Sequence, residues 1–192
     1  MNRLHPPRRL GRLTGPVVLA TVVLLGLTSC SGEDSSESEE GSSSASSSEA
    51  KKAEAVLNAG LEAQTAGDLT AAAEQYEKTL ELDPDNKFAL YNLALIDEAS
   101  QNYGLAEEHY RAALKADPAY QPALFNLAIL RTQVDPEEAV SLYRKAVAAK
   151  KTDAASWLNL GLLLRAAGDT QEGNQAVARA IELDPKLTDP AE

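Results

Sequence analysis

Residues 87–118 decide the fold, and they read KFALYNLALIDEASQNYGLAEEHYRAALKADP. In each half a set of apolar residues recurs with helical spacing: Leu90, Leu93 and Ala94 in the first, and Ala106, Tyr110, Ala113 and Leu114 in the second. Asp117-Pro118 ends the second helix, because proline lacks an N–H and biases the residue before it away from helix. Two helices this short cannot bury their apolar faces alone, so the stretch predicts a helix hairpin that stacks on copies of itself.

Copies of this hairpin lie on both sides of it. Asp-Pro recurs at Asp83-Pro84, 34 residues before Asp117-Pro118, and again at Asp184-Pro185. Small residues mark one position in each first helix: Gly60, Ala94, Ala128 and Gly161. An alanine and a tyrosine mark two positions in the second helices: Ala72, Ala106 and Ala139, then Tyr76, Tyr110 and Tyr143. Because a small residue lets two helices approach closely, this spacing predicts four stacked hairpins.

The pattern resembles the tetratricopeptide repeat, in which aromatic, Leu-Gly, Ala and Pro positions stand at fixed offsets within about 34 residues. Trp157-Leu158-Asn159-Leu160-Gly161 matches the opening of that repeat best. The resemblance implies an all-α fold, a right-handed α-α solenoid of about four helix pairs in residues 51–187, with a short tail at 188–192. The repeats are expected at about 53–86, 87–120, 121–153 and 154–187.

Two repeats depart from the family pattern. The third is one residue short, with Val134-Asp135-Pro136 in the turn between its helices. The fourth has Gly173 and Val177 where the family has alanine and an aromatic residue. We therefore expect the second helix of the fourth repeat to be the weakest and to form the outer end of the stack.

Residues 1–29 are expected to be a lipoprotein signal peptide. The start is basic, and residues 17–27 form an apolar run of 11 residues, shorter than the roughly 20 that a membrane span needs. Leu27-Thr28-Ser29-Cys30 follows and resembles the bacterial lipobox, which implies lipid acylation of Cys30, the one cysteine of the chain. An ordinary signal peptide is the alternative, and the sequence leaves both Sec and twin-arginine export open.

Residues 30–50 are expected to be a lipidated, disordered tether, because serine, glycine and acidic residues bury too little apolar surface to offset the entropy of ordering. The net charge of the chain is −11 at pH 7. This charge excludes nucleic acid as a partner, since nucleic-acid binding needs a basic face. Attachment to a membrane is therefore expected through the lipid on Cys30.

The sequence predicts no enzyme, no cofactor and no metal site. Once Cys30 carries lipid, no thiol remains, and the chain has no glycine-rich phosphate loop or zinc-binding helix motif. His109 is the one histidine after Cys30, and we expect it to be a solvated surface residue. The acid pairs Glu107-Glu108 and Glu137-Glu138 are expected in the first turns of second helices, where the helix dipole favours them.

Asparagine recurs at the sixth position of every repeat, as Asn58, Asn92, Asn126 and Asn159. In the resembling family this position faces a concave groove, where an amide can donate to and accept from a peptide backbone. The neighbouring fifth and ninth positions would form an apolar floor: Leu57, Tyr91, Phe125 and Leu158, then Leu61, Leu95, Ile129 and Leu162. The alternative is that the asparagines bridge adjacent repeats.

The resemblance therefore predicts a membrane-anchored protein–protein interaction scaffold or assembly factor, on the extracytoplasmic side of a bacterial membrane. An extended partner segment with apolar side chains would bind in the groove. The family's dicarboxylate clamp binds a C-terminal carboxylate through lysine, asparagine and arginine at five fixed positions. It is excluded here, because only one of the residues at those positions matches the clamp. These residues are Leu57, Leu61, Asn92, Pro122 and Asn126. The alternatives are an accessory subunit of an envelope enzyme and, more distantly, a small-ligand-binding lipoprotein. Self-association and the number of membranes stay open.

Overall fold

A computed structural model describes residues 40–189 of the chain, and the burial of its side chains from residue 48 onward. The chain divides into two units, Met1–Glu37 and Ser38–Glu192, and all described helices belong to the second. The predicted signal peptide, Cys30 and the first part of the tether lie outside the described residues.

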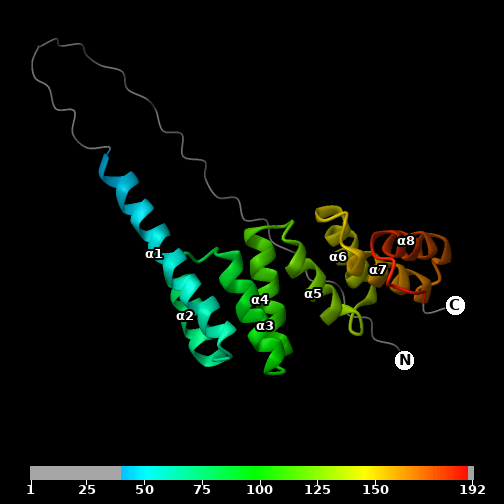
Figure 1. Cartoon of the computed structure of the whole chain (residues 1–192), viewed down its shortest axis with the longest axis horizontal. Coiled ribbons are helices and arrows are strands. Elements are labelled where there is room, and N and C mark those ends of the chain that lie inside the picture. The colour runs from blue at the N-terminus through cyan, green and yellow to red at the C-terminus, as the bar shows by residue number, and fades with distance from the viewer. Residues whose placement is uncertain (1–39, 190–192) are drawn as a thin grey trace, which may run out of the picture. The chain divides into compact units, whose positions relative to one another are not determined.

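Eight α-helices make up the described part, which contains no strand (Figure 1). In chain order they are α1 (Glu40–Thr65), α2 (Leu69–Leu82), α3 (Lys87–Ala99), α4 (Tyr103–Ala116), α5 (Gln121–Arg131), α6 (Pro136–Ala149), α7 (Ala154–Ala166) and α8 (Thr170–Leu183). Contacts are most extensive within the pairs α1–α2, α3–α4, α5–α6 and α7–α8, and each pair also packs on the next. The predicted stack of four helix hairpins is confirmed.

Side-chain caps set where most of the helices begin. Asp68 accepts a hydrogen bond from the Ala71 N–H at the start of α2, and Asn86 accepts one from the Ala89 N–H at the start of α3. The caps of α6, α7 and α8 make the same contact: Asp135, Asp153 and Asp169. Each cap satisfies an N–H that has no partner inside its helix. Local sequence therefore specifies these boundaries.

The turns between the helices of a hairpin differ in the third repeat. Gly67, Gln101 and Gly168 occupy the same repeat position and have positive φ values of 84°, 61° and 93°. The described turn between α5 and α6 has no such residue. The one-residue deletion predicted from the sequence therefore removes the left-handed residue of this turn, and Asp135 caps α6 directly.

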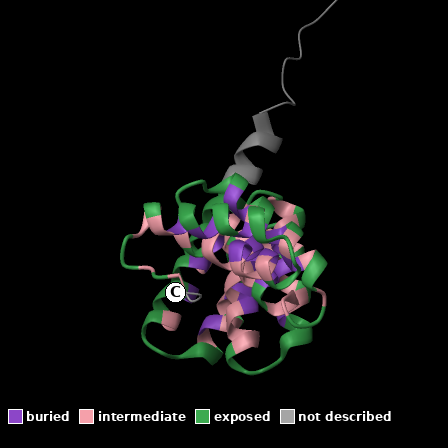
Figure 2. Ribbon diagram, turned by 90° about the vertical axis from the view of Figure 1, so that its right-hand side faces the viewer, coloured by how far each residue is buried: buried purple, intermediate pink, exposed green. Residues whose placement is uncertain are grey.

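The core lies between the two helices of each hairpin and between successive hairpins, and exposed residues cover the outside (Figure 2). The small residues of the pattern are all fully buried: Ala72, Ala94, Ala106, Ala128 and Ala139. Tyr76 and Tyr110 are 0% exposed and Tyr143 is 2% exposed. The tyrosines thus fill the space that the alanines leave between neighbouring helices.

The fourth hairpin packs through glycine. A Cβ built on Gly161 would lie 2.7 Å from the carbonyl oxygen of Gly173 and 2.8 Å from the backbone nitrogen of Val177. The residues that depart from the family pattern, Gly173 and Val177, are therefore those that let α7 and α8 touch backbone to backbone. Helix α8 is complete over Thr170–Leu183, and its expected weakness stays a prediction.

Both ends of the folded part differ from expectation. Helix α1 begins at Glu40, so residues 40–50, expected in the tether, are helical. Serine and alanine tolerate helix, and a helix already formed over residues 51–65 extends at little cost. At the other end, the guanidinium of Arg165 on α7 pairs with both carboxylate oxygens of Asp189 at 2.6 and 2.7 Å. The tail residue Asp189 is thereby held against the last hairpin.

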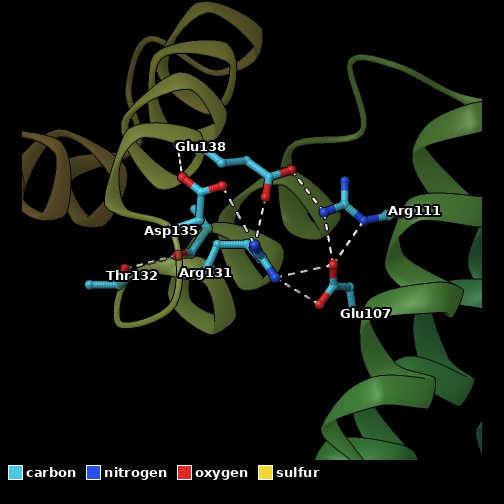
Figure 3. Close-up of polar contacts among 7 residues, drawn as sticks. Glu107, Arg111, Arg131, Thr132, Asp135 and Glu138 are labelled. Atoms are coloured by element: carbon cyan, nitrogen blue, oxygen red, sulfur yellow. Dashed lines mark hydrogen bonds and ion pairs between the residues drawn. The ribbon is translucent and has the colours of Figure 1, made fainter. Parts of the chain in front are cut away.

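An ion network joins the second and third repeats (Figure 3). Arg131 on α5 lies 3.2 Å from Glu107 and 2.7 Å from Glu138, and Arg111 reaches the same two carboxylates at 2.8 Å. The hydrogen bond from Arg111, with the charge of Arg131, holds the pKa of Glu107 below its usual value. Glu107 was expected in the first turn of α4, but that turn holds no acid. Its role is this contact between repeats.

Candidate functional site

The side chains predicted for the groove come from the first helix of each hairpin: α1, α3, α5 and α7. We call the surface made by repeat positions five, six and nine the groove face. Its residues are Asn58, Asn92, Asn126 and Asn159 with Leu57, Tyr91, Phe125, Leu158, Leu61, Leu95, Ile129 and Leu162. Asn58 is exposed, and the other three asparagines are half-buried.

Asn126 bridges two repeats through tyrosine hydroxyls. Its Nδ2 donates to the Tyr91 hydroxyl at 3.2 Å and to the Tyr110 hydroxyl at 3.3 Å. Tyr110 in turn donates to Glu98 Oε2 at 2.5 Å, so its hydroxyl must accept from the amide nitrogen of Asn126. Burial, reinforced by the Glu98 carboxylate, raises the pKa of Tyr110 far above its ordinary value. The bridging role, the alternative left open by the sequence, thus applies to this nitrogen.

The amide nitrogen of Asn92 is also used inside the protein, because it donates to the Phe88 carbonyl oxygen of the same helix at 2.8 Å. Asn159 lies close to the Tyr143 hydroxyl, whose pKa is raised by burial. No described residue donates a hydrogen bond to the Oδ1 atoms of Asn92 and Asn126. The middle of the asparagine row therefore offers acceptors to a ligand rather than the donor–acceptor pairs expected from the sequence.

The apolar positions of the groove face divide into two groups. Leu57 is 9% exposed and belongs to the core cluster around Tyr76. Leu61 and Ile129 are 40% and 45% exposed, which is high for side chains of this size. The others are half-buried: Tyr91, Leu95, Phe125, Leu158 and Leu162. The ninth position thus supplies the accessible apolar surface, while the fifth also serves the core.

Sequence reasoning missed an aromatic cluster beside the groove face. Tyr120 stacks edge-on against Phe88 and Tyr91, with ring centroids 5.8 and 5.4 Å apart. Lys87 lies 5.2 Å from the ring centroids of Phe88 and Tyr120 and pairs with Asp117 at 2.6 Å. Phe88 precedes Tyr91 by one helical turn, so that spacing was a usable signal. Tyr120 follows α4 and carried no such signal.

Residues of the groove face line three of the described cavities. The first, about 560 Å³, is lined by residues of α1, the end of α2, the connection before α3 and α3 itself, among them Leu57, Asn58 and Phe88. We call it the N-terminal cavity. The second, about 700 Å³, lies between the third and fourth repeats and is lined by Tyr143, Asn159 and Leu162 among others. A third cavity, about 430 Å³, is lined by Leu61, Glu62, Thr65 and Ala66. Five of the predicted groove residues therefore line cavities of a size that can hold side chains of a ligand.

His109 is not the solvated residue that the sequence led us to expect. Its Nδ1 lies 2.7 Å from Asp97 Oδ2, and its side chain is 31% exposed. The pair links α3 to α4, so its role is structural. Among the described residues, no group of three or more histidine, cysteine or acidic side chains is arranged to hold a metal ion. None of the described helices combines the length and apolarity needed to cross a bilayer.

The comparison with known families decides the identity of the fold. The sequence model of the tetratricopeptide repeat matches residues 57–121 and 128–187. This chain belongs to the tetratricopeptide-repeat family. No curated protein sequence matches the chain as a whole or in part. The tetratricopeptide fold supports interaction with protein or peptide partners, which agrees with a face that offers apolar side chains and acceptor oxygens.

Solved structures of tetratricopeptide proteins share the architecture. MamA is 19% identical with a TM-score of 0.62, over 75% of this chain and 85% of the MamA chain. PilF from Pseudomonas aeruginosa is 23% identical with a TM-score of 0.63, over 73% of this chain and 64% of that chain. A mutant O-GlcNAc transferase from Thermobaculum terrenum is 27% identical with a TM-score of 0.54, over 60% of this chain and 22% of that chain. These likenesses establish the fold.

Proposed function

We propose that this tetratricopeptide protein is a lipid-anchored scaffold or assembly factor of the bacterial cell envelope. The observation that carries the binding role is the groove face, where exposed apolar side chains lie beside acceptor oxygens and three cavities. An extended segment of a partner protein fits such a face, because its backbone N–H groups can donate to the asparagine oxygens. Its apolar side chains would cover Leu61 and Ile129.

The anchor rests on the sequence around Cys30. A basic start, a short apolar run and the lipobox-like Leu27-Thr28-Ser29-Cys30 support lipid attachment. Two or more acyl chains at one cysteine hold a protein on a membrane firmly, whereas one chain is marginal. The acidic, serine-rich residues that follow would hold the folded head away from the membrane surface, on the extracytoplasmic side.

Replacing Cys30 by serine is expected to release the protein from bacterial membranes and to abolish its labelling with radioactive palmitate. The serine variant keeps the apolar run, so an ordinary signal peptide would still export it. Membrane fractionation and acyl labelling of both proteins, expressed in the same bacterium, provide the measurement. Unchanged labelling in the serine variant would disprove the lipid anchor and leave the binding role untouched.

Replacing Ile129 by glutamate is expected to abolish specific capture of the partner by the groove face without unfolding the protein. Ile129 is 45% exposed, so the charge is tolerated in the free protein, but it would be buried under an apolar ligand at a cost of several kcal/mol. Val134→Glu is the matched control, since Val134 is 71% exposed and lies outside the groove face. Solubilised membranes passed over the wild-type protein and both variants, with quantitative mass spectrometry, provide the measurement.

A protein retained by the wild type and by Val134→Glu but lost from Ile129→Glu is the expected partner. If every retained protein also binds Ile129→Glu, the groove face is not the binding surface. Circular dichroism of each variant establishes that the helices remain intact.

A further inference from the structure

The N-terminal cavity differs from the rest of the groove face in its charge. Three carboxylates line it, those of Glu49, Glu54 and Asp83, and its described lining contains no lysine, arginine or histidine. The sequence just before it, residues 31–48, carries further acidic residues and no basic one. Acids gathered in one concave region with low-dielectric walls focus a negative potential there.

No ion pair joins these carboxylates to a lysine or arginine within the described part of the chain, although Lys51 and Lys52 lie one helical turn from Glu54 and Glu49. Lys51 and Lys52 are exposed on α1, and neither lines the cavity. Lys87 lies outside the lining as well, and its ammonium group pairs with Asp117 at 2.6 Å. Asp83 accepts a hydrogen bond from the neutral amide of Asn86 at 2.9 Å, so the described lining holds three carboxylates and no cation.

Apolar surface completes the cavity. Leu57, Leu82 and Phe88 line it alongside the three acids, and Phe88 is 46% exposed. A lysine or arginine side chain has matching chemistry, because its aliphatic stem covers apolar surface while its head remains charged. An aromatic ring adds attraction for the cationic head. An apolar side chain would leave the carboxylates uncompensated, and an acidic one would be repelled.

Hydrogen-bond donors are also favoured along the rest of the groove face, because the amide oxygens of Asn92 and Asn126 can accept hydrogen bonds from a ligand. A second copy of this chain fits poorly as the occupant, because its net charge is −11. We propose that the N-terminal cavity takes a lysine or arginine side chain of the partner, so that the preferred ligand is an extended segment with a basic residue at one end of an apolar stretch. This proposal rests on the proposed function of the groove face, and it specifies the chemistry of the partner segment.

The test uses the unit Ser38–Glu192, which contains every described helix and its own core. The probes are short blocked peptides of one apolar, extended sequence that carry arginine at the amino end, arginine at the carboxyl end, or glutamine at both. Dissociation constants are measured by fluorescence anisotropy. One of the arginine peptides is expected to bind about fivefold more tightly than the glutamine peptide. This preference should vanish near 1 M salt, where the screening length falls to about 3 Å.

The double variant Glu49→Gln/Glu54→Gln is expected to remove the preference for arginine, so that it binds the arginine and glutamine peptides with the same affinity. Glu74→Gln/Glu77→Gln is the matched control, since it removes the same charge from exposed positions of α2 that line no described cavity. The site for a cationic side chain is disproved if the wild-type protein binds the arginine and glutamine peptides equally. It is also disproved if the control variant loses the preference to the same extent. Peptide binding by the groove face is not affected by either result. If no peptide binds, the groove itself is disproved.

Discussion

Replacing Gly161 by alanine is expected to lower the free energy of unfolding by about 3 kcal/mol, at the upper end of the usual cost of overpacking. The added Cβ would lie 2.7 Å from Gly173 O, 2.7 Å from Val177 Cγ2 and 2.8 Å from Val177 N. Two of these are backbone atoms in the interior of α8. They cannot rotate away as a side chain does, so α8 would have to move off α7 as a unit.

Gly60 and Gly104 provide the matched comparisons. A Cβ on Gly60 would meet the Tyr76 ring at 2.6 Å, and a ring can tilt, so Gly60→Ala should cost less than Gly161→Ala. A Cβ on Gly104 in α4 would meet nothing within 4 Å, so Gly104→Ala should stabilise the protein by about 0.5–1 kcal/mol through helix propensity. Urea denaturation followed by circular dichroism measures all three. Equal costs at positions 60 and 161 would contradict backbone contact as the cause.

The hairpins could be predicted from the sequence because each depends on short-range information. The spacing of Leu90, Leu93 and Ala94 marks a helix face, and Asp117-Pro118 marks an end. Repetition then makes a weak local signal strong, since the same residue types recur in each copy. One hydrogen bond follows the same period. The tyrosine of the second helix donates to a residue 12 positions earlier in the same repeat, as Tyr110 does to Glu98 and Tyr76 to Gln64.

The hydrogen bonds and side-chain contacts at the groove face could not be predicted in the same way. Asn126 meets tyrosines 16 and 35 residues away, and nothing in its own repeat shows that its amide nitrogen is used there. The cluster of Phe88 with Tyr120 and the pair of His109 with Asp97 likewise depend on how one helix lies on another. Periodicity identifies which face a residue occupies, whereas hydrogen bonding depends on the distance between particular atoms across that face.

The beginning of α1 shows that composition can also fail to predict local structure. Residues 40–50 have the composition of a flexible linker, and composition alone predicts no structure for them. They are helical because they continue a helix that residues 51–65 already form against α2. Each added residue then gains a hydrogen bond without a new nucleation cost. Composition describes a segment in isolation, so it does not include the effect of a neighbouring helix that the segment can extend.

Alkaline pH is expected to unfold this protein through its buried tyrosines. Burial raises the pKa of Tyr76, Tyr110 and Tyr143 above the ordinary value of 10.0. In the unfolded chain these hydroxyls ionise near pH 10, whereas in the folded protein they hold their protons. Their contribution to stability is therefore complete below pH 10 and is lost as the pH rises above it. The loss is up to about 1.4 kcal/mol per pH unit for each tyrosine that stays protonated.

Tyr110→Phe separates this effect from the titration of lysines in the same range. The variant loses the hydrogen bond to Glu98, so it should be less stable than the wild type at neutral pH by about 1–3 kcal/mol. It should also lose stability less steeply above pH 10, so the two curves converge. Tyr103→Phe removes a hydroxyl from a side chain that is 56% exposed, and its curve should parallel that of the wild type. Urea denaturation over a series of alkaline pH values measures the slopes, and parallel curves for Tyr110→Phe and wild type would show that the buried hydroxyl does not control alkaline unfolding.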